Sequence, residues 1–212
     1  MSVAFIFPGQ GTQYVGMGKE IYEQSSEAKE YFDNVFSVLD FDLKTAMFEG
    51  PEEVLKQTEY TQPAIVAYSL FLAKKVMQKG ITPDYVAGHS LGEYTALGVA
   101  GFIGEEDTVK LTAKRGLIMS EVTEEVKGTM AAIVGLESQK IEEICNSIEG
   151  VAEAVNYNEP KQTVIAGTVE GIEKAGEALK KAGAPKEFTN GYITAMNIIG
   201  ENTVMIKKYT TG

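Results

Sequence analysis

The segment Gly88–Gly92, with the sequence GHSLG, constrains the fold of this chain more than any other feature. It follows the apolar run Tyr85–Ala87 and precedes a helical pattern over Glu93–Ala100 that ends at Gly101. A serine with glycines two residues before and after it is typical of a tight turn between a buried strand and a helix, because glycine avoids a Cβ clash there. The segment therefore predicts a layered α/β fold with Ser90 exposed on the turn.

Hydrophobic periodicity predicts the remaining elements. Thr61 is expected to cap a helix with Pro63 in its first turn, and Ser138 to cap another. Amphipathic helical spacing runs through residues 18–47 and ends at Gly50-Pro51, and the C-terminal stretch shows two weak strand patterns. The expected strands are Val3–Phe7, Tyr85–Ala87, Thr129–Val134, Ala152–Tyr157, Thr163–Ala166, Tyr192–Ile198 and Thr203–Ile206, and the expected helices are Thr61–Gln78, Glu93–Ala100, Glu105–Val122, Gln139–Ser147 and Glu170–Lys181. From Gly128 onward the βαββα order indicates most of a ferredoxin-like unit, without its last strand.

Composition excludes several classes of function. The chain has 19 Lys and Arg against 30 Asp and Glu, a net charge of −11, which argues against a nucleic-acid binder. The single cysteine, Cys145, excludes a disulfide framework and a multi-cysteine metal site, and no metal site is expected. No targeting segment is visible, and no apolar stretch approaches the roughly 20 residues of a membrane span. A cytoplasmic protein without membrane contact is expected.

Ser90 is the candidate nucleophile. The helix after the turn directs its N-terminal amides at the oxygen that becomes negative during acyl transfer, so the Leu91 amide is a candidate oxyanion donor. His89 is the only histidine, but a general base must reach the serine oxygen, and adjacent residues on such a turn project in different directions. We therefore expect His89 to pack beside the turn, which leaves Ser90 without a histidine partner in this chain.

Four segments, in order along the chain, carry a resemblance. They are Phe7–Gln13 (FPGQGTQ), Thr61–Ala64 (TQPA), Gly88–Tyr94 (GHSLGEY) and Asn156–Gln162 (NYNEPKQ). Together they resemble the malonyl-CoA:acyl-carrier-protein transacylases of fatty-acid biosynthesis and the related polyketide synthase acyltransferase domains. The resemblance covers about Met1 to Ala184, and four linked motifs are far more specific than one serine turn.

The resemblance implies a fold and a reaction. It implies an α/β-hydrolase-like large domain, incomplete here, over residues 1–125, with an inserted ferredoxin-like small subdomain over 126–186 and a divergent tail over 187–212. The family moves a malonyl group from malonyl-CoA to an enzyme serine and then to the phosphopantetheine thiol of acyl carrier protein. It needs no cofactor beyond the coenzyme A of its substrate. The partners expected are malonyl-CoA and acyl carrier protein, with the chain itself a monomer.

Four residues take site roles under the resemblance. Ser90 is the acylated nucleophile, Gln10 supplies an oxyanion amide beside that of Leu91, and Arg115 binds the malonyl carboxylate. A planar guanidinium holds a carboxylate through two parallel hydrogen bonds, which an ammonium cannot do. The alternative for Arg115, the only arginine in the chain, is a surface ion pair with Glu121 or Asp107. Gln13 and Gln62 are expected to hold loops through backbone hydrogen bonds, with a place in the pocket lining as the alternative.

The sequence departs from the family after Ala184. The family's base is a histidine in a Pro-Phe-His segment, whereas this chain continues PKEFTN and contains no such segment. We therefore expect a truncated or frameshifted sequence with impaired catalysis, because a serine without a base is poorly activated. Two other readings stay open: a serine esterase or thioesterase with water as acceptor, and a non-catalytic remnant that only docks a carrier protein.

Overall fold

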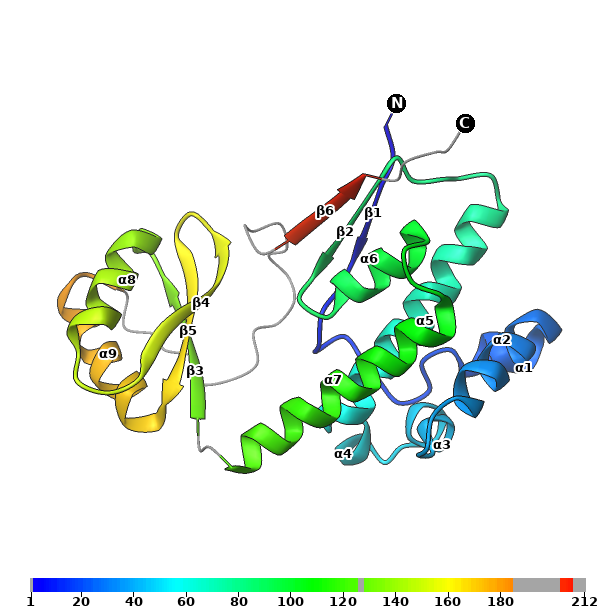
Figure 1. Ribbon diagram of the computed structural model, residues 1–212, viewed down its shortest axis with the longest axis horizontal. Coiled ribbons are helices and arrows are strands. Elements are labelled where there is room, and N and C mark those ends of the chain that lie inside the picture. Colours follow the sequence, from blue (N-terminus) through cyan, green and yellow to red (C-terminus); the bar gives the residue numbers. More distant parts are fainter. Residues whose placement is uncertain (1, 126–127, 185–202, 208–212) are drawn as a thin grey trace. The chain divides into compact units, whose positions relative to one another are not determined.

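The computed structural model describes residues 2–125, 128–184 and 203–207, which form two compact units (Figure 1). One unit contains the residues up to Glu121 together with the strand at 203–207, and the other begins at Val122. The first holds β1 (Ala4–Phe7), α1 (Lys19–Gln24), α2 (Ser26–Ser37), α3 (Leu43–Phe48), α4 (Glu52–Leu55), α5 (Thr58–Gln78), β2 (Tyr85–His89), α6 (Gly92–Ala100), most of α7 (Glu105–Glu125) and β6 (Thr203–Lys207).

The sheet of the first unit has the order β1-β2-β6. β1 and β2 are parallel, and the helices α1 to α5 form the long crossover connection that two parallel strands require. Phe7 lies opposite Gly88, so the loop that follows β1 starts beside the Ser90 turn. β6 pairs antiparallel with β2, which confirms the strand expected at Thr203–Ile206. The strand expected at Tyr192–Ile198 lies outside the described residues.

The expectation of continuous amphipathic spacing over residues 18–47 is wrong in detail, because three helices occupy this region. Ser25 lies between the first two and caps α2, its hydroxyl accepting a hydrogen bond from the Ala28 amide at 3.3 Å. Asp42 caps α3 by accepting from the Thr45 amide at 2.9 Å. Each cap satisfies an N–H group that has no intrahelical partner. A new helix therefore starts after each cap, although the apolar spacing continues across it without a break.

The two helix caps predicted from the sequence are both wrong. α5 begins at Thr58, and Thr61 lies inside it, where its hydroxyl donates to the Leu55 carbonyl. Ser138 is the first residue of α8 rather than its cap, because its hydroxyl bonds the Thr163 hydroxyl at 3.0 Å. In both places the side chain bonds a group outside its own helix instead of capping the helix.

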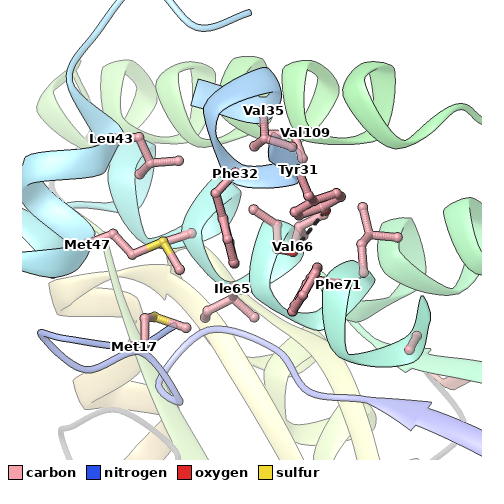
Figure 2. Close-up of a cluster of buried hydrophobic side chains, with 14 of the residues drawn as sticks. Met17, Tyr31, Phe32, Val35, Leu43, Met47, Ile65, Val66, Phe71 and Val109 are labelled. Atoms are coloured by element: carbon pink, nitrogen blue, oxygen red, sulfur yellow. Dashed lines mark hydrogen bonds between the residues drawn. The ribbon is translucent and has the colours of Figure 1, made fainter. Parts of the chain in front are cut away.

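The core of the first unit is an aromatic cluster between α2, α3 and α5. Figure 2 shows Phe32, Phe71 and Met47 within it, and all three side chains are fully buried. The rings of Phe32 and Phe71 lie 5.3 Å apart between centroids. Burying a side chain of this size contributes roughly 1.5–3 kcal/mol, so this cluster fixes the position of α5.

The second unit contains a three-stranded antiparallel sheet of order β3-β5-β4 with two helices packed on it (Figure 1). Its core includes Ile133, Ile141, Ile165 and Leu179, and Cys145 is buried among them. The βαββα order predicted from the sequence is confirmed. The elements are β3 (Gly128–Val134), α8 (Ser138–Ser147), β4 (Ala152–Glu159), β5 (Gln162–Thr168) and α9 (Val169–Lys181).

The fold as a whole is mixed α/β. Across residues 2–125, 128–184 and 203–207, no helix combines the length and apolar character needed to cross a membrane.

Candidate active site

The turn between β2 and α6 is strained at Ser90. Its φ of +49° makes it the one residue other than glycine with a positive φ in the described part of the chain. A Cβ on Gly88 would lie 2.0 Å from the Gly92 carbonyl carbon, and a Cβ on Gly92 would lie 2.3 Å from the Phe7 carbonyl oxygen. Only glycine fits at both positions, so the sequence pattern follows from backbone contact. Strain at one exposed serine is a feature found at functional sites.

The N-terminus of α6 lies immediately after Ser90. α6 begins at Gly92, and the Leu91 side chain before it is buried, which anchors the turn in the core. The first N–H groups of a helix have no intrahelical partner and carry the positive end of the helix dipole. This end of α6 therefore offers hydrogen-bond donors and partial positive charge next to the serine oxygen.

Arg115 of α7 points at Ser90. Its Nη2 donates to the Ser90 Oγ at 3.3 Å and its Nη1 donates to the Gln62 Oε1 at 2.7 Å. The guanidinium also lies over the Tyr94 ring, 5.8 Å from the ring centroid. Asp107, one proposed partner in a surface ion pair, pairs with Lys110 instead. The arrangement brings the one guanidinium and the candidate nucleophile together.

Gln62 does not play the expected role of holding a loop through backbone hydrogen bonds. It is fully buried, and its amide bonds two side chains of α7 rather than loop backbone: Oε1 accepts from Arg115, and Nε2 donates to the Met119 sulfur at 3.3 Å. A buried amide with both ends bonded is held in one orientation. Gln62 therefore fixes the guanidinium toward Ser90, a role the TQPA segment alone did not indicate.

Thr58 and Gly116 were also missed. Thr58 lies one helical turn before Gln62, and its Oγ1 accepts from the Gln10 Nε2 at 2.9 Å. A Cβ on Gly116 would lie 2.6 Å from the Thr58 carbonyl oxygen, so glycine lets α7 approach the first turn of α5. Thr58 and Gln62 are four residues apart, which places both on one helix face. This spacing is the feature of the sequence that could have indicated Thr58. That face connects the Gln10 loop with Arg115.

The loop after β1 carries Gln10 and packs against the end of β2. A Cβ on Gly9 would lie 3.0 Å from both Nδ1 and the carbonyl oxygen of His89, so the imidazole lies against this loop. The Gln13 Oε1 accepts from the Gly11 amide at 2.9 Å, which confirms its expected role of holding the loop through the backbone. Gln10 and Ser90 thus come from adjoining segments.

The groups gathered here suit one kind of chemistry. They are a serine hydroxyl, a guanidinium within hydrogen-bond reach of it, and a helix N-terminus. Together they can hold a small acyl group whose carbonyl meets the serine and whose far end is a carboxylate. Within the described ranges, no cluster of three or more His, Cys, Asp or Glu side chains could hold a metal ion.

Comparison with known proteins agrees with this geometry. The family model described as the acyl transferase domain matches residues 4–197. The chain is 43% identical over 187 residues to the malonyl CoA-acyl carrier protein transacylase of Bacillus subtilis strain 168, covering 87% of this chain and 59% of the relative. It is 44% identical over 186 residues to the protein of the same name from Escherichia coli K12, covering 86% and 60%. The chain thus spans about three-fifths of the length of these relatives.

Solved structures give the same picture. The malonyl CoA-acyl carrier protein transacylase of Coxiella burnetii aligns with a TM-score of 0.82 at 39% identity, covering 92% of this chain and 62% of that one. A malonyl-transacylase in complex with its type II polyketide synthase acyl-carrier protein aligns with a TM-score of 0.82 at 37% identity, covering 92% and 64%.

Proposed function

The chain belongs to the acyl transferase domain family, and from this premise we propose that its site transfers malonyl groups from malonyl-CoA to the phosphopantetheine thiol of an acyl carrier protein. One observation carries the proposal. The Arg115 guanidinium reaches the Ser90 oxygen at 3.3 Å while its other terminal nitrogen is held by the buried Gln62.

The position of Arg115 favours a malonyl group over other acyl groups. The malonyl carboxylate lies one methylene beyond the carbonyl carbon that the serine attacks. A guanidinium beside the serine oxygen is therefore within reach of that carboxylate and can bond it with two N–H groups. An acetyl or longer neutral acyl group offers no carboxylate to this cation and would therefore gain no charge-assisted hydrogen bonds from it.

The proposed transfer has two half-reactions. The Ser90 Oγ attacks the thioester carbonyl, the carbon–sulfur bond breaks, and the hydroxyl proton passes to the coenzyme A sulfur. The carrier-protein thiol then attacks the serine ester, and its proton returns to Ser90. In both steps the Leu91 and Gln10 amides stabilise the oxyanion, and Thr58 holds Gln10 through its side chain. These groups hold the substrate and stabilise its oxyanion, and the proposed reaction uses no metal and no bound cofactor.

We also propose that this 212-residue polypeptide is a slow catalyst by itself. His89 is its only histidine, and the position of that imidazole against Gly9 supports a packing role rather than a base for Ser90. Serine hydrolases that lose a member of the catalytic triad keep a residual acceleration of roughly 10³–10⁴ over water. Ser90 acylation is therefore expected to be slow but detectable.

The finer structural assignments belong to the same proposal. Residues 1–125 are assigned to part of an α/β-hydrolase-like large domain, 126–186 to a ferredoxin-like subdomain and 187–212 to a divergent tail, of which β6 pairs with β2. The parallel pair β1-β2 with the Ser90 turn supports the first assignment, and the βαββα order supports the second. We also propose that the protein is cytoplasmic and monomeric.

Intact-mass measurement tests the function. The folded chain is incubated with malonyl-CoA, and peptide mapping locates any malonyl adduct. We expect the adduct on Ser90, none on the Ser90→Ala variant, and faster loss of the adduct to a holo acyl carrier protein than to water. An adduct that forms equally on Ser90→Ala would contradict the assignment of the nucleophile.

Two other outcomes would favour the other readings. An adduct lost to water faster than to the carrier thiol would favour an esterase or thioesterase. A folded chain that forms no adduct but binds the carrier protein would favour a non-catalytic docking remnant.

A further inference from the structure

The ring of Tyr94 lies against a face of the Arg115 guanidinium, a contact that the proposed transfer does not use. The guanidinium carbon is 5.8 Å from the ring centroid, within the range of a cation–π contact. Both residues are half-buried. Because the negative face of the ring attracts the cation and water is partly excluded, this contact favours one orientation of the guanidinium over others.

Tyr94 belongs to the same rigid segment as the nucleophile. It stands four residues after Ser90, in the first turn of α6, and its backbone N–H donates to the Leu91 carbonyl at 3.1 Å. The Leu91 side chain is buried, and Gly92 fits closely against the Phe7 carbonyl oxygen. The backbone of Tyr94 is therefore fixed relative to Ser90, so a contact with its ring ties the guanidinium to the nucleophile's own segment.

The hydrogen bond to Gln62 alone leaves the guanidinium free to turn. An arginine side chain has many rotamers, and the bond from Nη1 to the Gln62 Oε1 at 2.7 Å fixes only one edge of the group. The bond to the Ser90 Oγ does not replace a second anchor during the reaction, because that oxygen attacks the substrate. The Tyr94 ring covers a face rather than an edge. Gln62 and Tyr94 together therefore fix the guanidinium plane, in which a carboxylate must lie to accept two parallel hydrogen bonds.

We propose that Tyr94 is a positioning residue for the selection of the acyl group. Its ring sets the plane of the Arg115 guanidinium, so that the N–H groups meet the malonyl carboxylate while Ser90 attacks the carbonyl. Without the ring, the guanidinium populates other orientations, and only a fraction of the chains is ready to bind the carboxylate. This inference rests on the proposed function and adds a residue that touches the arginine rather than the reacting atoms.

Nuclear magnetic resonance of the arginine side chain tests the contact. Arg115 is the only arginine, so a chain labelled with ¹⁵N-arginine gives one Nε–Hε signal that needs no assignment. We expect the ring to displace this signal from the position of free arginine in the native chain and in Tyr94→Phe. The signal should move back toward that position in Tyr94→Leu. The control is Phe102→Leu, at an aromatic side chain 62% exposed, which should leave the signal unchanged.

The ratio of malonyl to acetyl adducts on Ser90 tests the role, with both thioesters supplied together and intact mass as the readout. A cation–π contact between half-buried groups corresponds to a change of about fivefold, so Tyr94→Leu should lower the ratio by about that factor. Tyr94→Phe keeps a ring and should restore the native ratio. A general loosening of the turn would slow both acylations equally and leave the ratio unchanged. Tyr94→Met, which also lacks a ring, serves as a second variant, and circular dichroism checks that each variant is folded.

Three results would overturn the proposal. The first is an arginine signal that does not move in the ring-free variants. The second is a malonyl-to-acetyl ratio that stays within about twofold of the native value in those variants. The third is a Tyr94→Phe variant that behaves like Tyr94→Leu. A native chain without any Ser90 adduct would instead contradict the proposed function, and the arginine signal would still decide whether Tyr94 orients the guanidinium.

Discussion

Replacing Gly92 with alanine should destabilise the first unit strongly, because the backbone leaves no room for a side chain there. The added Cβ would lie 2.3 Å from the Phe7 carbonyl oxygen, whereas real Cβ atoms essentially never approach closer than 3.0 Å. β1 and α6 must therefore separate by at least 0.7 Å, the difference between these two distances. Phe7 belongs to a strand paired in register with β2, so neither side can move without loss of sheet hydrogen bonds.

The expected cost follows from measurements of overpacked cores, which lose about 1–3 kcal/mol. The added Cβ would meet backbone atoms, which cannot rotate away. We therefore expect Gly92→Ala to lower the free energy of unfolding by about 2–3 kcal/mol. With a urea m-value of about 2 kcal/mol/M, the unfolding midpoint should fall by roughly 1 M. Tyrosine fluorescence monitors the transition, because most described tyrosines lie in the first unit.

Gly104→Ala is the matched control. A Cβ at Gly104 would meet only a carboxylate oxygen of Asp107 at 4.0 Å. The free energy of unfolding of Gly104→Ala should therefore stay within about 0.5 kcal/mol of that of the native chain. If the unfolding midpoint of Gly92→Ala lies within about 0.2 M urea of that of Gly104→Ala, about a fifth of the expected shift, then backbone contact does not require glycine at the Ser90 turn.

Three further predictions concern the site, a helix cap and the core. Thr58→Val removes the acceptor for Gln10 and should slow Ser90 acylation about tenfold for malonyl-CoA and acetyl-CoA alike, measured by intact mass, with Thr58→Ser restoring the rate. Asp42→Ala should lose about 1 kcal/mol in urea unfolding at pH 7. Hydrogen bonds from Thr45 lower the pKa of Asp42 below its ordinary 3.8, so its carboxylate stabilises the fold above that pH, and the stability is lost as the pH falls through the lowered pKa. The native chain should therefore lose more unfolding free energy than Asp42→Asn when the pH falls from 7 to 3. An equal loss in the two proteins would contradict the role of the Asp42 carboxylate. Phe32→Ala should cost about 3–5 kcal/mol by the same assay, and a loss below 1 kcal/mol would show that the aromatic cluster does not hold the unit together.

Elements whose ends are fixed by backbone requirements could be predicted from the sequence. α6 ends at Ala100 because Gly101 follows it with φ of 81°, a conformation that glycine adopts freely. α5 ends at Gln78, and the Ser90 turn lies between strand and helix, both as predicted. Glycine positions are informative because few other residues can replace them there.

Helix starts were harder to predict, because a cap depends on where the side chain finally bonds. Ser25 and Asp42 cap helices, whereas Ser138, the same type of residue as Ser25, bonds a neighbouring strand. Local sequence offers the same hydroxyl or carboxylate in each case. Tertiary packing decides its partner, and the sequence alone does not contain that partner's position.

The site, too, could be predicted from the sequence only in part. The pairing of Ser90 with Arg115 was expected only because of the family resemblance, since the residues lie 25 positions apart. Gln62 and Arg115 lie 53 positions apart, and their hydrogen bond arises from the packing of α5 on α7 at Gly116. A buried amide between two helices leaves no periodic signal, so its role emerges only from the structure.

Recognition of a carboxylate beside Ser90 is the central claim, and competition between two substrates tests it most directly. Malonyl-CoA and acetyl-CoA are supplied together, and intact mass follows both Ser90 adducts in the native chain and in Arg115→Ala. A hydrogen bond to a charged group contributes about 1.5–3 kcal/mol, so Arg115→Ala should lower the malonyl-to-acetyl ratio about 10- to 150-fold. An unchanged ratio would contradict the account, because Arg115 would then play no part in selecting the acyl group.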